Sequence, residues 1–247
     1  MEGKLLRPEV KSEGSGAKVR RLFPSTDLEH YDPFVLLDEF FVDPEAGFPR
    51  HRHAGFEAVT YIIEGGFKHK DNLGNDSSIG EGGVQRFTAG KGIEHSEMPV
   101  GEKQSHGFQL WINLPKELKE TEPSYQKVTA EKIPVKHEGK TKIKTIIGED
   151  SPVKTNTPVL YQDVLLEEAC FTSVEFPENY RGFLYVHEGE IMIDFMDKEK
   201  EKISNDQAYF PKEENRISIR CNARSRFIVI SGKPIKEKIR LQGSVVK

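Results

Sequence analysis

The fold is decided by the stretch Phe48-Pro-Arg-His-Arg-His-Ala-Gly-Phe-Glu57, which runs into Ala58-Val-Thr-Tyr-Ile-Ile63 and then Glu64-Gly-Gly66. A β-branched and aromatic run followed by two glycines is typical of a strand that enters a tight turn. His51 and His53 are two residues apart, and side chains at that spacing point to the same face of a strand. The stretch therefore predicts a strand that presents two imidazoles in one direction.

A second pair with the same spacing, His95 and Glu97, lies in Ala89-Gly-Lys-Gly-Ile-Glu-His-Ser-Glu-Met-Pro99. Its glycines allow a tight backbone turn just before the pair. If the two strands lie side by side, the four side chains converge on one point. Three imidazoles and a carboxylate suit a divalent first-row transition metal and leave coordination positions for water or substrate. The sequence therefore predicts one metal site, formed by His51, His53, His95 and Glu97.

Strand signals dominate the rest of the chain. Short apolar or alternating runs are separated by Gly, Pro, Asn or Asp, which favours a sandwich or barrel over a parallel α/β sheet. Only residues 115–120 have a helical pattern, with Pro115 at a first-turn position. The predicted strands cover residues 34–41, 58–63, 84–87, 108–114, 143–147, 159–166, 171–176, 183–186, 190–195, 216–220 and 226–230.

Composition narrows the function classes. The chain has 247 residues and a net charge of −4, with basic and acidic residues intermixed, so we expect no direct binding to nucleic acid. No apolar leader or membrane-length run is present, so we expect an intracellular protein without a membrane span. Cys170 and Cys221 form no CxxC motif and are interpreted as reduced, buried thiols. No phosphate-binding loop, dinucleotide fingerprint or serine-nucleophile elbow is found.

The two halves of the chain resemble each other. Residues 57–66 align with residues 181–190 at a constant offset of 124, which places Gly65 opposite Gly189. At the same offset His51 meets Glu175 and His53 meets Pro177, so the ligand pair is absent from the second half. A Lys-rich, weakly apolar stretch at residues 126–144 is interpreted as the boundary. We therefore predict two domains, residues 1–130 with the metal site and residues 131–247 without it.

Longer phrases in the sequence resemble the pirin family, whose members are two-domain cupins. The resemblance is dense over residues 5–128 and thinner afterwards. It implies an all-β fold of two cupin-type double-stranded β-barrels that arose by internal duplication, with the metal in the mouth of a barrel. The phrases that carry it are residues 12–21, 32–40, 49–57, 88–99 and 105–113.

The resemblance also implies ligands and a metal. Pirins bind iron through His-x-His and His-x-Glu, which correspond here to His51, His53, His95 and Glu97. It thus implies one iron per chain, with manganese, cobalt, nickel, copper and zinc as the alternatives. Spacing alone leaves Glu57 open as a ligand, although Gly55 can break the strand register. We follow the family pattern, which assigns the carboxylate ligand to Glu97, and expect Glu57 to contact the ligands without binding the metal itself.

Two roles follow from the resemblance. Some pirins are similar to quercetin 2,3-dioxygenases, which cleave the flavonol ring with O₂ and release carbon monoxide; Glu97 would then be both ligand and catalytic base. Eukaryotic pirin instead is an iron-dependent transcription co-regulator that binds protein partners. We expect a cytoplasmic location, or a nuclear one in a eukaryote. The sequence itself leaves both roles open.

The remaining histidines have no ligand spacing. We interpret His30, His69, His137 and His187 as structural or surface residues, and His106 as a packing residue or an outer hydrogen-bond partner of a ligand. Pirins continue beyond residues 232–237 into a further segment, whereas this sequence ends at Lys247.

Overall fold

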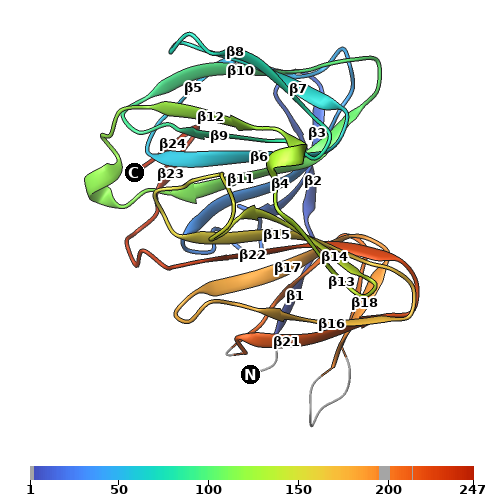
Figure 1. Cartoon of the computed structure of the whole chain (residues 1–247). Coiled ribbons are helices and arrows are strands. Elements are labelled where there is room, and N and C mark those ends of the chain that lie inside the picture. Colours follow the sequence, from blue (N-terminus) through green and yellow to red (C-terminus); the bar gives the residue numbers. More distant parts are fainter. Residues whose placement is uncertain (1–2, 195–200, 213) are drawn as a thin grey trace. The chain divides into compact units, whose positions relative to one another are not determined.

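A computed structural model describes residues 3–194, 201–212 and 214–247 (Figure 1). These residues form antiparallel strands and two short 3-10 turns, η1 (Lys116–Leu118) and η2 (Ala130–Lys132), with no α-helix among them. The all-β prediction is confirmed, and η1 lies inside the segment predicted to be helical. Residue 195, the last of the predicted strand 190–195, lies outside the described residues.

The chain divides into two units. The N-terminal unit comprises Glu9–Ile133, Pro152–Thr157 and Ile235–Lys247, and the C-terminal unit comprises Met1–Pro8, Pro134–Ser151 and Pro158–Pro234. The chain therefore passes between the units several times. The division into a domain of residues 1–130 and a domain of residues 131–247 therefore stays a prediction. No helix in the described ranges has the length and apolar character needed to cross a bilayer.

The N-terminal unit contains two sheets, drawn one above the other in Figure 1. The larger has the order β12-β9-β6-β11-β4-β3-β2, and the smaller has the order β5-β10-β7-β8. A short hairpin of β23 and β24 joins the unit, and its Val245 bridges to Ala54. The bounds are β2 (Glu9–Glu13), β3 (Ala17–Phe23), β4 (Phe34–Val42), β5 (Phe48–His53), β6 (Phe56–Glu64), β7 (Gly66–Asp71), β8 (Asp76–Gly80), β9 (Val84–Thr88), β10 (Ile93–Pro99), β11 (Ser105–Asn113), β12 (Ser124–Val128), β23 (Leu241–Gln242) and β24 (Val245–Val246).

The C-terminal unit has the same construction. Its larger sheet has the order β1-β20-β17-β22-β15-β14-β13, and its smaller sheet has the order β16-β21-β18-β19. The bounds are β1 (Lys4–Leu6), β13 (Val135–Glu138), β14 (Thr141–Ile147), β15 (Val159–Leu166), β16 (Cys170–Glu175), β17 (Arg181–Glu188), β18 (Glu190–Asp194), β19 (Glu201–Ser204), β20 (Gln207–Phe210), β21 (Arg216–Cys221) and β22 (Ser225–Gly232).

The repeated turn of the two halves is visible in the backbone. Gly65 and Gly189 adopt φ angles of +74° and +75°, a left-handed conformation that glycine tolerates best. In the N-terminal unit, the Ser105 hydroxyl accepts from the Gly66 N–H (3.2 Å) and donates to its carbonyl (2.8 Å). In the C-terminal unit, Ser225 makes the same two bonds with Glu190, at 3.1 and 2.7 Å. Two copies of one turn support the predicted duplication.

Apolar side chains between the sheets form the cores. In the N-terminal unit one cluster centres on Phe40, Ile62 and Phe67, and another on Phe56 and Phe87. In the C-terminal unit, inward residues of β16 and β21 such as Val174, Ile217 and Ile219 join the core. These strands correspond to β5 and β10 of the N-terminal unit, so apolar packing replaces the ligand pairs there.

The Lys-rich stretch at residues 126–144 is mostly strand. It contains the end of β12, all of β13 and the start of β14, and it passes from one unit to the other between Ile133 and Pro134. All four residues of β13 are exposed, which explains the polar composition. The strands β13 and β14, at the edge of the larger C-terminal sheet, therefore occupy part of the stretch that the sequence analysis interpreted as the boundary.

Candidate metal centre

β5 and β10 place the candidate ligands on neighbouring antiparallel strands. His95 lies directly opposite His51, and Ile93 lies opposite His53. The ring centroids of His51 and His95 are 4.6 Å apart, and those of His53 and His95 are 5.0 Å apart. One ring nitrogen of each of the three histidines falls within 4.8 Å of the others. The structure therefore brings together three of the four predicted ligands as one group.

The outer nitrogens of His51 and His53 are fixed by carbonyl groups. His51 Nδ1–H donates to the Pro49 carbonyl (2.7 Å), and His53 Nδ1–H donates to the Ser244 carbonyl (3.2 Å). A neutral imidazole carries one N–H, so both Nε2 atoms have free lone pairs. These two atoms face each other at 2.8 Å. Two lone pairs at that distance favour a cation that both can bind.

His95 adds a third nitrogen. It is 1% exposed, and its Nε2 has no hydrogen-bond partner within the described ranges. A buried polar atom without a partner is costly unless a ligand satisfies it. Burial, followed by the neighbouring His51, lowers the pKa of His53 to about 3, and burial likewise lowers the pKa of His95. The neutral imidazoles that result are the form that binds a metal. This donor set fits a divalent transition-metal ion.

Glu97 lies two residues beyond His95 on β10 and is also buried. The register of β10 shifts between His95 and Glu97, so Glu97 pairs with Phe48 on one side and His69 on the other. Its carboxylate accepts hydrogen bonds from Thr60 (3.1 Å) and from the Gln85 amide. Burial raises its pKa. Its nearest metal-competent partners are His69 and His95 rather than the His51–His53 pair.

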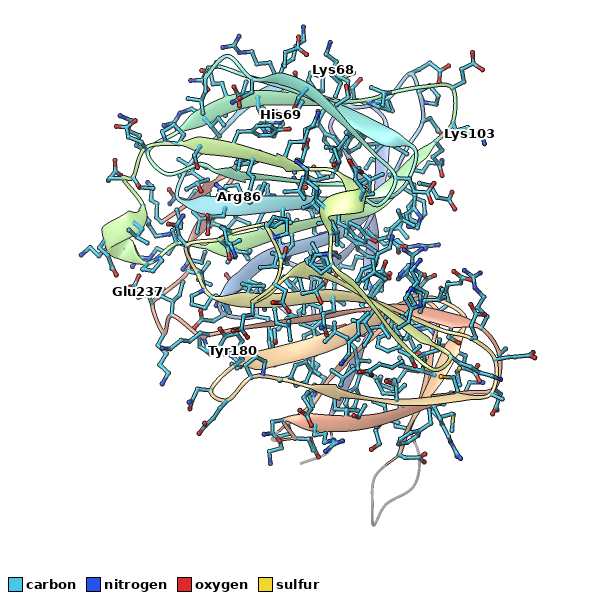
Figure 2. The ribbon with its side chains drawn as sticks, viewed as in Figure 1. Lys68, His69, Arg86, Lys103, Tyr180 and Glu237 are labelled. Carbon is cyan, nitrogen blue, oxygen red and sulfur yellow. The ribbon has the colours of Figure 1, made fainter. Side chains whose placement is uncertain are left out.

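The sequence analysis interpreted His69 as a structural or surface residue, and the structure places it beside the candidate ligands His95 and Glu97. It is fully buried, and its ring stacks on Tyr125 with centroids 4.3 Å apart. Figure 2 shows it pointing between the two sheets while its neighbour Lys68 points outward. A sequence signal existed, because His69 and Asp71 repeat the i, i+2 spacing of the two ligand pairs. The signal was overlooked because His69 has no second histidine at this spacing. Asp71, two residues later, is the residue that completes the pair.

The expectation for Glu57 was wrong. Gly55 adopts φ +83° between β5 and β6, and the side chain of Glu57 then turns away from the histidines. The Glu57 carboxylate accepts hydrogen bonds from Thr88 Oγ1 (2.8 Å) and from the backbone and side chain of Asn156 (2.7 and 2.8 Å). It therefore supports the Pro152–Thr157 segment instead of the candidate ligands.

Other predicted residues fall outside the centre. His106 Nε2 is 2.8 Å from Glu39 Oε1, and its ring stacks on Phe41, so the packing interpretation holds. Cys170 and Cys221 are free and buried, and they are cross-strand neighbours in the C-terminal unit. Both groups of metal-competent side chains among the described residues lie in the N-terminal unit.

A cavity of about 550 Å³ opens onto the histidines. His51, His53, Glu97 and Gln109 form one side of it. Its walls are mainly apolar, and the Arg21–Asp38 ion pair also lines it. The lining residues used below are Leu36, Phe40, Phe48, Phe67, Trp111 and Leu241. Apolar walls with a few polar groups are typical of small-molecule sites.

Two units of paired sheets, one with clustered histidines at a cavity, define a two-domain cupin. A family model described as pirin matches residues 16–112, and one described as the pirin C-terminal cupin domain matches residues 161–247. Pirin from Homo sapiens is 37% identical over 243 residues, which are 96% of this chain and 83% of the human protein. The chain belongs to the pirin family.

Solved structures agree with this fold. A structure of quercetin 2,3-dioxygenase from Acinetobacter baumannii superposes with a TM-score of 0.86 at 28% identity, over 100% of this chain and 92% of that one. The bacterial pirin YhhW from Escherichia coli, in complex with nickel(II), superposes with a TM-score of 0.77 at 20% identity, over 94% of this chain and 99% of that one. The second likeness concerns the fold alone.

Proposed function

We propose that this pirin is a metal-dependent dioxygenase that cleaves flavonols such as quercetin with O₂ and releases carbon monoxide. The observation that carries the proposal is the cluster of three imidazole nitrogens beside an apolar cavity of about 550 Å³. The likeness to an Acinetobacter quercetin 2,3-dioxygenase supports the same reaction class. Small aromatic molecules match apolar walls of this kind.

The proposed ligands are His51, His53 and His95, with Glu97 as the carboxylate. Iron is the proposed ion, one per chain. When bound, such an ion supplies Lewis acidity toward a substrate oxygen and, if redox-active, electrons for oxygen chemistry. The part of the protein itself is to hold three imidazoles together on β5 and β10 and to place the Glu97 carboxylate in the cavity lining.

Glu97 is the proposed base. A flavonol must lose its 3-hydroxyl proton before the ring can be opened, and Glu97 is a cavity-lining carboxylate next to the histidines. Hydrogen bonds from Thr60 and Gln85 hold its position. The apolar walls formed by Phe40, Phe67 and Trp111 would orient a planar aromatic substrate and exclude water.

The test measures O₂ uptake and carbon monoxide release with quercetin, after anaerobic loading with iron, manganese, cobalt, nickel or copper. Glu97→Gln should keep metal through its amide oxygen but lose about 10²- to 10⁴-fold in rate, the usual cost of losing a positioned base. Glu94→Gln is the matched control, since Glu94 lies on the same strand but pairs with Arg50 at the surface. No carbon monoxide from any fully loaded form would favour the non-enzymatic, partner-binding role instead.

A further inference from the structure

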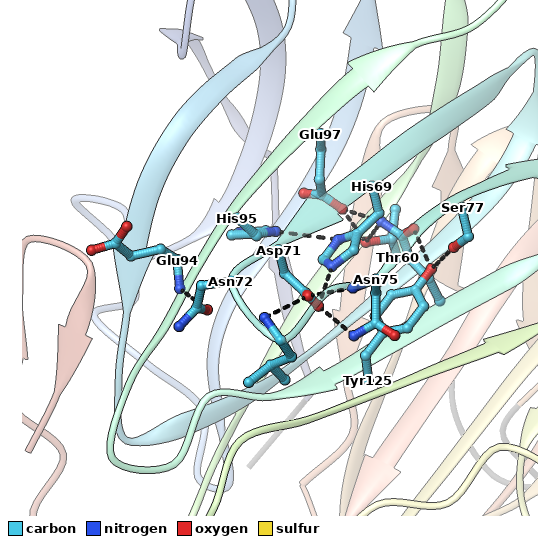
Figure 3. Close-up of polar contacts among 12 residues, drawn as sticks. Thr60, His69, Asp71, Asn72, Asn75, Ser77, Glu94, His95, Glu97 and Tyr125 are labelled. Atoms are coloured by element: carbon cyan, nitrogen blue, oxygen red, sulfur yellow. Dashed lines mark hydrogen bonds and ion pairs between the residues drawn. The ribbon is translucent and has the colours of Figure 1, made fainter.

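His69 and Asp71 lie behind the candidate ligands without belonging to the proposed ligand set. His69 Nε2 is 3.0 Å from Asp71 Oδ2, and His69 Nδ1 is 3.4 Å from His95 Nδ1. Figure 3 shows the row that results, with Asp71, His69 and His95 in contact one after another. The side chains of His69 and Asp71 are both 0% exposed. Water therefore does not compete for these contacts.

Asp71 is held as a hydrogen-bond acceptor. Its Oδ1 accepts the backbone N–H groups of Leu73 (2.9 Å) and Asn75 (3.0 Å). Its Oδ2 accepts the Asn75 side-chain amide (2.8 Å) as well as His69. Because N–H groups donate to both oxygens of Asp71, the carboxylate acts as an acceptor, and the hydrogen shared with His69 lies on His69 Nε2.

The proton on His95 follows from this. A neutral imidazole has one N–H, so His69 Nδ1 is a bare acceptor once Nε2 is the donor. The hydrogen between the two Nδ1 atoms then belongs to His95. Its Nε2 is left with a lone pair, and this is the buried atom without a partner within the described ranges.

We propose that His69 and Asp71 are positioning residues that hold His95 as its Nδ1–H tautomer and so keep its Nε2 available to a metal ion. The role toward a metal ion rests on the proposed function. The tautomer of His95, in contrast, is a property of the metal-free protein. A histidine that orients a second histidine extends the general rule that ligand imidazoles need an outer hydrogen-bond partner.

The direct test is long-range ¹H–¹⁵N NMR of the metal-free full chain with labelled histidine. We expect the His95 proton on Nδ1 and the His69 proton on Nε2. A His95 proton on Nε2, or a His69 ring protonated on both nitrogens, would overturn the proposal. This readout needs neither metal nor substrate.

Asp71→Asn should reverse the direction of the two hydrogen bonds that join residue 71 to His69 and His69 to His95. The two backbone N–H groups keep the amide oxygen at the Oδ1 position, which places the amide nitrogen opposite His69 Nε2. That nitrogen donates, so the His69 proton moves to Nδ1 and the His95 proton moves to Nε2. We expect the reversed NMR pattern and weaker nickel(II) binding by competition with a chelator. An unchanged His95 tautomer and an unchanged affinity for nickel(II) would contradict the proposed role of His69 and Asp71.

His69 variants separate positioning from packing. His69→Leu should weaken nickel(II) binding about 10- to 100-fold, the usual cost of removing an outer partner. His69→Gln should recover much of this loss, because its amide can donate to Asp71 and accept from His95. The matched control is His106→Leu, which removes another carboxylate-paired, ring-stacked histidine of the same unit. Equal losses in His69→Leu and His106→Leu would reduce His69 to a packing role.

A competing arrangement makes His69 itself a ligand, since it also groups with His95 and Glu97. X-ray absorption of the nickel(II)-loaded protein distinguishes the two. We expect the same number of imidazoles around nickel in the wild type and in His69→Leu, and a loss of one imidazole would overturn the proposal. If the wild type bound no metal, the proposed function would fail. The NMR result would still decide whether His69 and Asp71 fix the tautomer of His95.

Discussion

At the scale of single residues, one buried ion pair sets a clear energetic expectation. In the C-terminal unit, Arg226 binds Asp163 through two parallel contacts of 2.8 and 2.5 Å, and the aspartate side chain is 3% exposed. Two-pronged contacts of this kind are among the strongest side-chain hydrogen bonds. Removing only one partner leaves a buried charge without compensation.

Arg226→Met should therefore lower the free energy of unfolding by about 3 kcal/mol, the low end of the range for breaking a buried pair. Replacing both partners, as Arg226→Met with Asp163→Leu, should recover most of that loss. The control is Lys68→Met, which breaks an exposed pair with Asp76 and should cost less than about 1 kcal/mol. Urea unfolding measures all three. A double variant less stable than the single one would contradict the explanation.

Among the site residues, the sequence predicted the members of the two ligand pairs and missed the part played by a third strand, β7. His51, His53 and His95 could be predicted because i, i+2 spacing places side chains on one face. The position of Glu57 was predicted wrongly, because the chain leaves β5 at Gly55 and enters β6, which belongs to the other sheet of the unit. The spacing of His69 and Asp71 indicates a shared face, but it does not report that β7 pairs with β10, which is what places His69 beside His95.

At the scale of elements, Lys119 is one of the residues that bind the β23–β24 hairpin to the end of β5. Lys119 Nζ donates to the carbonyl of Gly55 (2.9 Å), to the side chain of Asn113 (2.7 Å) and to the carbonyl of Val246 (3.5 Å). The same hairpin region supplies the Ser244 carbonyl that fixes His53. Lys119 thus links the loop after β5 to the strands that orient a candidate ligand.

Burial lowers the pKa of Lys119 to about 8 from its usual 10.5. Between these two values the unfolded chain binds more protons at this position than the folded chain, so stability from this group rises with pH. The unfolding free energy of the wild type minus that of Lys119→Met should therefore increase from pH 8 to pH 10.5. Urea unfolding across that range measures the difference. A difference that falls with pH would contradict the assigned shift.

The strands themselves were partly predictable. Apolar runs such as those in β6 and β22 gave clear signals because both faces are covered. β8 and β13 were missed because exposed edge strands carry polar residues on both faces, and their backbone pairing alone defines them. The register shift inside β10 also has no sequence signature, yet it decides where Glu97 lies.

At the scale of the whole molecule, one fold occurs twice, and among the described residues the groups of candidate ligands lie in the N-terminal copy. The aligned turns at Gly65 and Gly189 allowed the duplication to be predicted from sequence. The exchange of short segments between the units could not be predicted, because it depends on long-range contacts such as the pairing of β1 with β20. The histidine cluster and its absence from the aligned strands of the second half lead to the central claim of one metal site per chain.

The most direct test of that claim is metal content, measured by elemental analysis after loading with iron(II) and removal of free metal. The wild type should hold about one ion per chain, because the three clustered imidazoles and Glu97 are proposed as a single site for a divalent transition metal. The double variant His51→Ala with His95→Ala should hold almost none, since it loses two of the three clustered histidines. Full occupancy in the double variant would contradict the account.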